Sequence, residues 1–272
     1  MIASITTVTN LELPELSPYI TLKRPEEHLQ KGMFIAEGEK VFSRLFASPL
    51  KIFSALLTPE WFEEKKELLE TNKNSIQVFI AGKAQLETIV GFRLHQGIMA
   101  TAQIPKQITV TEFLEEKKEP ALTVLVDGIV NAENMGVLAR NCACFGVDAL
   151  FVLPTSCDPY LRRSVRNSMG NIFMLPVVYI SEPEKEIQQL KNSGFTLYAA
   201  HPNAQSRDIR QCSFSKKSCI VLGAEGNGIS EELLSLCDEF VTIPMKTGID
   251  SLNVASAGAV MLWEASKSAK VL

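Results

Sequence analysis

A polar loop and a run of small residues near the end of the chain form the first stretch that could bind a ligand. Residues 243–258 begin with Ile-Pro at the end of a predicted strand and turn through Gly248 and Asp250. Ser251 and Asn253 are good N-cap residues, and the side chains after them are small enough for close backbone approach. Main-chain N–H groups of such a loop can bind a ligand. A capped helix after a strand is also common in α/β proteins, and this stretch alone favours that simpler interpretation.

A second stretch places three glycines around one carboxylate, and a helix capped by Ser230 follows it. The glycines are Gly223, Gly226 and Gly228, and the carboxylate is Glu225. The G-x-G-x-x-G spacing of dinucleotide-binding folds is absent here, as is the Lys-Ser/Thr pair that ends a P-loop. A glycine loop that carries Glu instead of Lys suits a neutral or cationic ligand better than a polyphosphate.

The third stretch runs from Asn134 to Arg140, and the elements around all three stretches predict a mostly parallel sheet with helices on both faces. The continuous apolar run over residues 121–126 is typical of a strand buried on both faces. Ligands bind such sheets at the carboxyl ends of the strands, where all three stretches lie. Further strands are predicted over residues 149–153, 175–180, 196–200, 219–222 and 240–243, and helices over residues 135–145, 183–192, 230–237 and 254–267.

The first part of the chain predicts a separate, smaller α/β domain. A length of 272 residues favours two domains. We place the N-terminal domain at residues 1–105, a charged linker with a short helix at residues 106–120, and the second domain at residues 121–272. The N-terminal strands are predicted over residues 32–38, 52–57, 77–81 and 97–102, and its helices over residues 39–47, 59–70 and 83–90.

Composition indicates a cytoplasmic protein without a membrane or metal partner. The chain is 46% hydrophobic and 21% charged, and it has neither an apolar run of membrane-spanning length nor the features of a signal peptide. All six cysteines fall in the second half, most of them in apolar runs, which favours reduced thiols. Cys142 and Cys144 lack a second Cys/His pair at ligand spacing, and His201 is isolated, so we expect no metal site.

The net charge of -4 argues against a grip on nucleic acid over the whole chain. Neither half is basic, because residues 1–105 carry 11 Lys and Arg against 12 Asp and Glu, and the remainder carries 16 against 19. A nucleic acid must therefore be held by a local patch, for which Arg162, Arg163 and Arg166 are the best candidates. Composition alone favours solvated surface charges instead.

Taken together, the three stretches resemble the SpoU/TrmH family of RNA ribose 2′-O-methyltransferases, within the SPOUT class. The N-terminal domain resembles the family's substrate-binding domain, of a ribosomal-protein L30e type, through residues 34–38 and 95–100. The family's ordered motifs are Asn-x-Gly-x-x-x-Arg at Asn134, Gly136 and Arg140, a Gly-x-Glu-Gly-x-Gly loop at residues 223–228, and Ile-Pro with Ser-Leu-Asn-Val-Ala at residues 243–244 and 251–255.

The resemblance implies a deep trefoil knot in the second domain, S-adenosylmethionine bound in a bent form within it, and a homodimer that shares its active sites. It also implies that the main chain near Gly223, Ile243 and Leu252 holds the cofactor. The residues that match the family's catalytic group are Asn134, Arg140, Glu225, Ser251 and Asn253.

Methyl transfer from a sulfonium to a ribose hydroxyl is a direct displacement, so the protein must align the reactants and remove a proton. The family accounts give Arg140 the activating role, but an arginine is a poor base. We therefore expect Arg140 to bind the adjacent phosphate, which helps to accept the proton. Asn134 and Glu225 would position Arg140, and Ser251 and Asn253 would shape the floor of the pocket.

The sequence thus predicts an S-adenosylmethionine-dependent RNA 2′-O-ribose methyltransferase. Its substrate is ribosomal or transfer RNA, and the resemblance of the separate N-terminal domain favours ribosomal RNA. One alternative is a non-catalytic RNA-binding or ribosome-assembly factor that keeps the fold, and a remoter one is a doubly wound oxidoreductase, against which the missing dinucleotide fingerprint counts. The dimer contact is predicted on residues 254–267, which mix small and bulky apolar side chains, among them Ala257, Val260, Met261 and Trp263.

Overall fold

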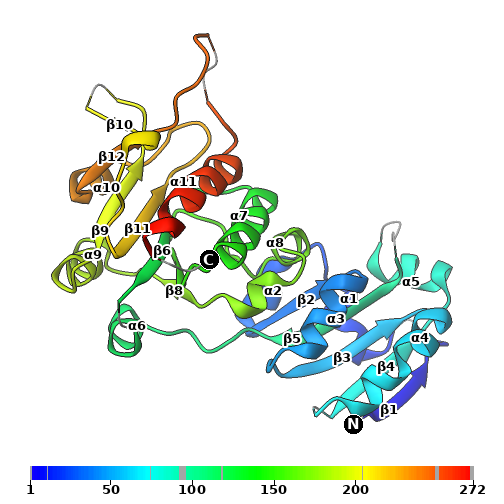
Figure 1. The fold of residues 1–272 in the computed structure, drawn as a ribbon. Coiled ribbons are helices and arrows are strands. Elements are labelled where there is room, and N and C mark those ends of the chain that lie inside the picture. Colours follow the sequence, from blue (N-terminus) through cyan, green and yellow to red (C-terminus); the bar gives the residue numbers. More distant parts are fainter. Residues whose placement is uncertain are drawn as a thin grey trace. The chain divides into compact units, whose positions relative to one another are not determined.

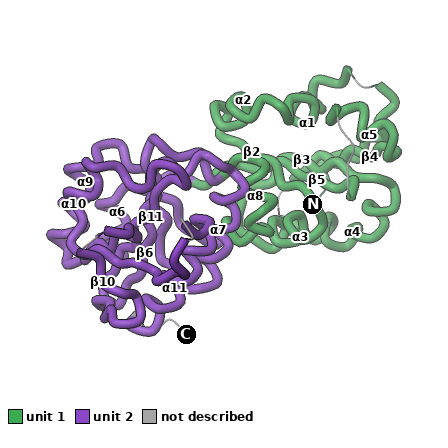
Figure 2. Tube along the Cα trace, turned by 90° about the horizontal axis from the view of Figure 1, so that it is seen from above, with its two compact units in different colours: residues 1–105, 160–173 green, residues 106–159, 174–272 purple. Residues whose placement is uncertain are grey.

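The computed structural model of the chain divides into two compact units (Figure 2). Unit 1 comprises residues 1–105 and 160–173, and unit 2 comprises residues 106–159 and 174–272. The residues that the structure describes are 2–10, 12–73, 75–91, 96–117, 119–203, 205–248 and 251–269.

Unit 1 contains a five-stranded mixed sheet in the order β1-β4-β3-β5-β2. Strands β1, β4 and β3 are parallel to one another, whereas β5 runs antiparallel to both β3 and β2. The strands are β1 (Ile2–Thr7), β2 (Met33–Glu37), β3 (Ile52–Leu57), β4 (Ile76–Ile80) and β5 (Ile98–Gln103). The helices are α1 (Ser17–Ile20), α2 (Pro25–Gln30), α3 (Glu39–Ala47), α4 (Pro59–Thr71) and α5 (Lys83–Val90).

Local signals explain where these helices begin and end. Thr58 caps α4 by accepting a hydrogen bond from the Trp61 amide, and Pro59 occupies the first helical position, where its missing N–H costs nothing. Gly91 ends α5 in the left-handed conformation.

In the core of unit 1, the Tyr19 hydroxyl is hydrogen-bonded to Ser54 at 2.8 Å, and burial raises the pKa of this phenol well above its ordinary value.

A short helix from the second half of the chain belongs to unit 1. Helix α8 (Arg162–Asn167) packs on β2, and Tyr160 and Phe173 on either side of it lie with their ring centroids 5.6 and 5.4 Å from that of Phe34. The Arg44 guanidinium also donates a hydrogen bond of 2.7 Å to the Met169 carbonyl. Residues 160–173 are therefore packed into unit 1, although they lie in the second half of the sequence.

Unit 2 contains a seven-stranded sheet in the order β10-β12-β9-β11-β6-β7-β8, in which every pair is parallel (Figure 1). All six side chains of β6 are buried, as its continuous apolar sequence predicts. The strands are β6 (Ala121–Val126), β7 (Ala149–Val152), β8 (Val177–Tyr179), β9 (Thr196–Ala200), β10 (Arg207–Asp208), β11 (Lys217–Leu222) and β12 (Glu239–Thr242).

Helices cover both faces of this sheet, which confirms the predicted fold class. On one face α6 (Val110–Glu116), α9 (Pro183–Asn192) and α10 (Glu231–Leu236) contribute to the main core, and on the other α7 (Ala132–Cys144) packs beside α11 (Val254–Ala269) (Figure 1). The helix of the expected linker is α6, whose Val110 and Phe113 are buried in that core. The trefoil knot stays a prediction.

Candidate active site

Three polar side chains from distant parts of unit 2 meet in one hydrogen-bonded chain. The Asn253 side-chain amide donates to Asn134 Oδ1 at 2.9 Å, and Asn134 Nδ2 in turn donates to Glu225 Oε1. Each side-chain amide thus donates a hydrogen bond to the next residue, and the last acceptor of the series is a carboxylate. The three motifs singled out in the sequence are therefore joined through their polar residues.

Helix capping fixes two of these residues. Asn253 Oδ1 accepts hydrogen bonds from the amides of Ala255 and Ser256, at 3.0 and 3.3 Å, and so caps the first turn of α11 as predicted. Asn131 caps α7 in the same way, with 2.8 Å from the Glu133 amide, and this places Asn134 in the first turn. The amide orientation of Asn253 is determined by the cap, which leaves its N–H₂ group to donate to Asn134.

The glycine loop that carries Glu225 is closed by its own main chain. Ala224 and Gly228 exchange two backbone hydrogen bonds, of 2.8 and 3.0 Å. A Cβ at Gly223 would lie 2.2 Å from the Gly228 carbonyl carbon, so only glycine fits there. Behind the loop, buried Asp127 accepts a hydrogen bond of 2.9 Å from the Ser230 amide, which fixes the loop to the end of β6.

A cavity of about 320 Å³ opens at the carboxyl ends of β9, β11 and β12. The three residues predicted to hold the cofactor, Gly223, Ile243 and Leu252, all line it, together with Glu225 and Ser251. The rest of the lining comes mostly from the same loops and the start of α11: Ala200, His201, Pro202, Leu222, Ala224, Gly226, Asn227, Gly228, Val241, Thr242, Met245, Val254 and Ala257.

Sequence reasoning missed the turn after β9 as part of this lining. His201 and Pro202 follow an apolar strand directly, and the same rule that located the other loops at the carboxyl edge also applies to them. The Asp250 of the predicted turn lies outside the described residues, whereas Gly248 lies in a turn with a positive φ of 88°.

Arg140 lies apart from the hydrogen-bonded chain. Six residues of α-helix turn through about 600°, so Arg140 and Asn134 project about 120° apart around α7. Arg140 is exposed, and within the part of the chain that the structure describes its guanidinium has no hydrogen bond or ion pair. The expected positioning of Arg140 by Asn134 and Glu225 is therefore not seen within a single chain.

The outer surface of α7 and α11 carries exposed apolar side chains. The two helices approach closely at Gly258, where a Cβ would lie 2.7 Å from Leu138 Cδ1. Val137, Val260 and Trp263 are 38%, 37% and 51% exposed, whereas the predicted contact residue Met261 is buried in its own chain.

The remaining predicted residues and groups take no part in this cavity. Arg162, Arg163 and Arg166 belong to α8 of unit 1. Burial, with smaller effects from Asp158 and Glu225, raises the pKa of the Cys157 thiol to about 11, so this cysteine is protonated at neutral pH. Among the described residues there is no group of three His, Cys, Asp or Glu side chains suited to a metal, and none of their helices is long and apolar enough to cross a membrane.

Comparison with known proteins shows the family to which this chain belongs. The model of the SpoU rRNA methylase family matches residues 121–263, and that of RNA 2′-O ribose methyltransferase substrate binding matches residues 35–108. The chain belongs to the SpoU family of RNA methyltransferases, as its motifs predicted. An uncharacterized tRNA/rRNA methyltransferase of Mycobacterium bovis is 32% identical over 253 residues, which are 90% of this chain and 85% of the relative.

Solved structures share the fold along nearly the whole chain. An AdoMet-bound rRNA methyltransferase from Sinorhizobium meliloti superposes with a TM-score of 0.82 at 23% identity, covering 97% of this chain and 98% of that one. The SpoU methyltransferase AviRb from Streptomyces viridochromogenes gives 0.81 at 23% identity, with 95% and 98% covered.

Proposed function

We propose that this protein transfers the methyl group of S-adenosylmethionine to a ribose 2′-hydroxyl of RNA, with ribosomal RNA the preferred substrate over transfer RNA. The observation that carries the proposal is the hydrogen-bonded chain Asn253–Asn134–Glu225 at the edge of the cavity lined by Gly223, Ile243 and Leu252. Support for the cofactor comes from the AdoMet-bound structures of the S. meliloti enzyme and of AviRb, and for ribose as the target from the match of residues 35–108.

The cavity suits this cofactor by size and chemistry. A cavity of about 320 Å³ falls in the range of small-molecule sites, and its lining combines apolar side chains with main-chain groups of three loops. Adenine would use those main-chain groups, and the exposed Glu225 carboxylate would attract the cationic sulfonium. In this assignment Gly223, Ile243 and Leu252 bind the cofactor, whereas Ser251 and Asn253 shape the floor on the substrate side.

Methyl transfer needs the hydroxyl in line with the sulfonium and a route for the proton. Arg140 would bind the phosphate next to the reacting ribose through its planar fork, and a phosphate oxygen would help to accept the proton. Arg140 points away from Asn134 and Glu225 of its own chain. We therefore propose that Arg140 completes the active site of the other subunit in a homodimer. The exposed apolar side chains of α7 and α11 would form the contact of that homodimer.

By function, residues 1–105 would recognise RNA as part of unit 1, which also contains residues 160–173, and the remainder of residues 121–272 would carry out catalysis. Residues 106–120 would connect the two, with α6 packed into the core of unit 2. We expect the protein to act in the cytoplasm. The experiment that tests the proposal is a mass map of ribose methylation in total RNA from cells with and without this protein. A 2′-O-methyl group that disappears with the gene and returns with wild-type protein is the expected result, and an unchanged map would contradict it.

A non-catalytic RNA-binding or ribosome-assembly factor with the same fold is the second candidate. The intact set of Asn134, Glu225 and Asn253 favours the enzyme, because a pure binding protein has no need of a polar chain beside the cofactor cavity. A calorimetric titration with S-adenosylmethionine separates the two, since the enzyme must bind it and the binding factor need not.

A further inference from the structure

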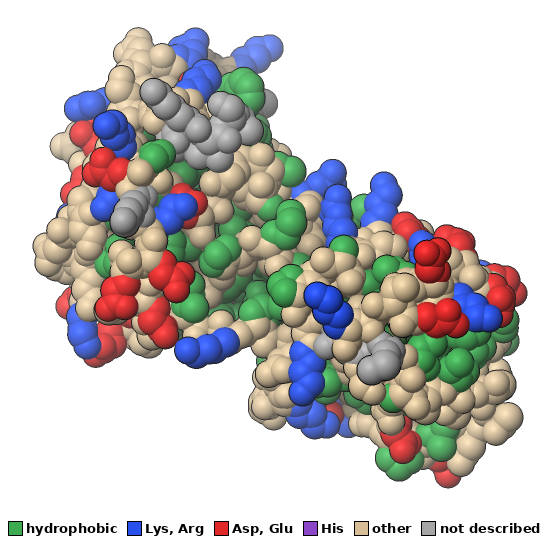
Figure 3. All heavy atoms as spheres, turned by 60° about the horizontal axis from the view of Figure 1, so that its bottom comes forward, with side chains coloured by type: hydrophobic (Ala, Val, Ile, Leu, Met, Phe, Trp, Pro, Cys, Tyr) green, Lys and Arg blue, Asp and Glu red, His purple; other side chains and the backbone are tan. Residues whose placement is uncertain are grey.

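Helix α8 changes the charge of the unit to which it belongs. Residues 1–105 alone carry 11 Lys and Arg against 12 Asp and Glu, but residues 160–173 add three arginines and no acidic residue. Unit 1 therefore carries 14 basic against 12 acidic residues, whereas unit 2 carries 13 against 19. On the face shown in Figure 3, basic and acidic side chains are interspersed, so an anion must be held at a local site.

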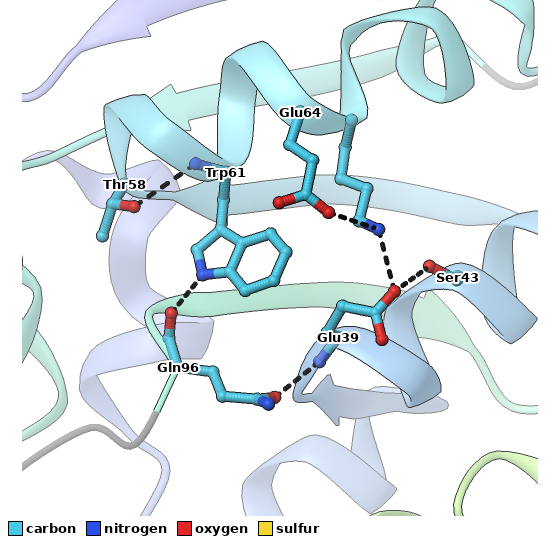
Figure 4. Close-up of polar contacts among 7 residues, drawn as sticks. Glu39, Ser43, Thr58, Trp61, Glu64 and Gln96 are labelled. Carbon is cyan, nitrogen blue, oxygen red and sulfur yellow. Dashed lines mark hydrogen bonds and ion pairs between the residues drawn. The ribbon is translucent and has the colours of Figure 1, made fainter.

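A cavity of about 390 Å³ lies in unit 1 where β2 ends and α3 begins. Its lining carries two carboxylates and two cations, Glu37, Glu39, Lys40 and Arg166, of which Arg166 comes from α8 and the others from one segment, together with Gln96 from another. Gln96 Oε1 accepts a hydrogen bond of 2.7 Å from the Glu39 amide, and the Gln96 carbonyl accepts one from the Trp61 indole (Figure 4). These contacts hold the wall of the cavity in a defined shape.

A buried carboxylate at this cavity holds two arginines of α8. Glu37 is only 5% exposed, and it forms ion pairs with Arg162 and, at 3.2 Å, with Arg166. The side chain of Arg162 is 17% exposed, but that of Arg166 is 44% exposed, so part of its guanidinium faces solvent. The second carboxylate of the wall, Glu39, is paired with Lys65 at 2.8 Å. Glu37 alone therefore faces the two arginines, and its side chain determines where their positive charge lies.

We propose that this cavity, with Arg163 and Arg166, binds a backbone phosphate of the RNA substrate, and that Glu37 is the positioning residue for Arg166. A guanidinium already held by a carboxylate loses less side-chain entropy when it binds a phosphate. Exposed Lys40 and Arg44 add positive charge on α3. The match to substrate-binding domains covers residues 35–108, so this surface extends the RNA contact to a helix outside that range.

The inference rests on the proposed function, because the partner it names is the same RNA. Backbone contacts do not depend on sequence, so a fluorescein-labelled pool of random 30-nucleotide RNA serves as the probe. Its affinity for the full-length protein is measured by anisotropy at several salt concentrations. For Arg166→Ala and Arg163→Ala we expect about tenfold weaker binding each, and a salt slope smaller by about 0.7 per lost phosphate contact.

Arg24→Ala is the matched control. Arg24 is an arginine of the same unit with a side chain 71% exposed, and it is paired with Glu27 at 3.2 Å. Its replacement removes the same charge and is expected to change neither the affinity nor the salt slope by more than about twofold. Equal losses in Arg24→Ala and Arg166→Ala would overturn the proposal, because the effect would then be net charge alone.

Two explanations of Glu37, neutralising the arginines or positioning Arg166, predict opposite effects of Glu37→Gln on the affinity for RNA. If Glu37 only neutralises the arginines, removing its charge should raise the affinity for RNA, whereas a positioning role predicts weaker binding with an unchanged S-adenosylmethionine affinity. Stronger binding of RNA would overturn the role of Glu37. Thermal melting checks that this variant is folded, and exposed Arg166→Ala carries the test of the site if it is not.

Two further results separate this site from the activity. Polyglutamate that displaces RNA as well as unlabelled RNA does would overturn RNA as the ligand. If the wild type methylates no RNA but Arg166→Ala and Arg24→Ala differ as expected, the proposed function fails and the site stands. If the wild type methylates RNA but these two variants bind it equally, the site fails and the function stands.

Discussion

Asn134 connects the glycine loop that carries Glu225 with the start of α11, and it does so with one side-chain amide. Its oxygen accepts from Asn253 and its nitrogen donates to Glu225, so both of its polar atoms are used. Asp at this position would have no donor for Glu225 and would place two carboxylates side by side, which costs free energy unless one of them is protonated. The amide is therefore required by the geometry rather than by size alone.

Arg140→Ala should leave the fold and the cofactor affinity almost unchanged, because the cavity proposed for the cofactor is lined by other residues. Methyl transfer should fall by at least about a hundredfold, which corresponds to about 3 kcal/mol of lost transition-state stabilisation. Arg140→Lys should not restore it, since an ammonium lacks the planar fork. Single-turnover methylation beside calorimetric cofactor binding measures both quantities, and near-normal turnover in Arg140→Ala would sink this role.

His28 predicts a pH dependence of stability in unit 1. The side chain is 5% exposed and lies 2.9 Å from the Thr21 hydroxyl, and its burial lowers its pKa below the ordinary value. The folded protein then binds this proton less readily than the unfolded chain does. The contribution of neutral His28 is fully present above the unfolded pKa of about 6.5, and it is lost as the pH falls below that value through the folded pKa.

We therefore expect the melting temperature of the wild type to decrease between pH 7 and pH 5 by more than that of His28→Gln. Circular dichroism melting at a series of pH values measures the difference. Parallel curves for the two proteins would show that other groups cause the acid sensitivity.

At the scale of elements, the glycine loop depends on one position that tolerates no side chain. Gly223→Ala would place a Cβ 2.2 Å from Gly228 main chain and force the loop open, so we expect cofactor affinity to fall at least about tenfold. Gly226→Ala is the control, because a Cβ there has no atom within 4 Å and the backbone is not in the left-handed region. Calorimetry with S-adenosylmethionine compares them, and equal affinities for the two variants would contradict the argument.

Elements with strong periodicity and clear end signals could be predicted to the residue. Helices α3, α5 and α9 and strands β3 and β6 have the expected bounds, because apolar spacing, Pro and Gly mark them. Strand β1 was missed because it is a largely exposed edge strand without alternation. Helix α8 was missed because its six residues bury only Ser164 and Val165, and what holds it is the distant Glu37.

The site itself could be located only in part from local patterns. Periodicity and the carboxyl-edge rule brought the three motifs to one side of the sheet, but Asn134 and Glu225 are 91 positions apart and their contact depends on tertiary structure. The direction of Arg140 was also out of reach, because it depends on where α7 presents each residue. Family resemblance supplied the roles, and the structure supplied the geometry that separates Arg140 from the other residues.

At the scale of the whole molecule, the exposed apolar surface of α7 and α11 predicts a homodimer. Trp263 is 51% exposed; in its own chain Phe145 lies edge-on to it at 6.3 Å between ring centroids, and the Lys267 ammonium lies 5.7 Å from its ring centroid. Trp263→Glu would place a charge in the contact at little cost to the monomer, so we expect a monomer with a nearly unchanged melting temperature. Light scattering measures the mass, and a monomeric wild type at micromolar concentration would remove the shared-site mechanism.

A dimer that shares its sites makes a further prediction for two variants, assayed at an S-adenosylmethionine concentration that fills the wild-type site but leaves the Gly223→Ala site largely empty. Arg140→Ala keeps the cofactor site and Gly223→Ala keeps Arg140, so a mixed dimer would contain one complete site if Arg140 acts across the contact. The two variants, carrying different tags and produced in one cell, can be purified through both tags to give mixed dimers alone. We expect about half the wild-type rate per dimer, because one of two equivalent sites is intact. If Arg140 acted within its own chain, both sites of the mixed dimer would lack an essential part, and its rate would be as low as that of either variant alone.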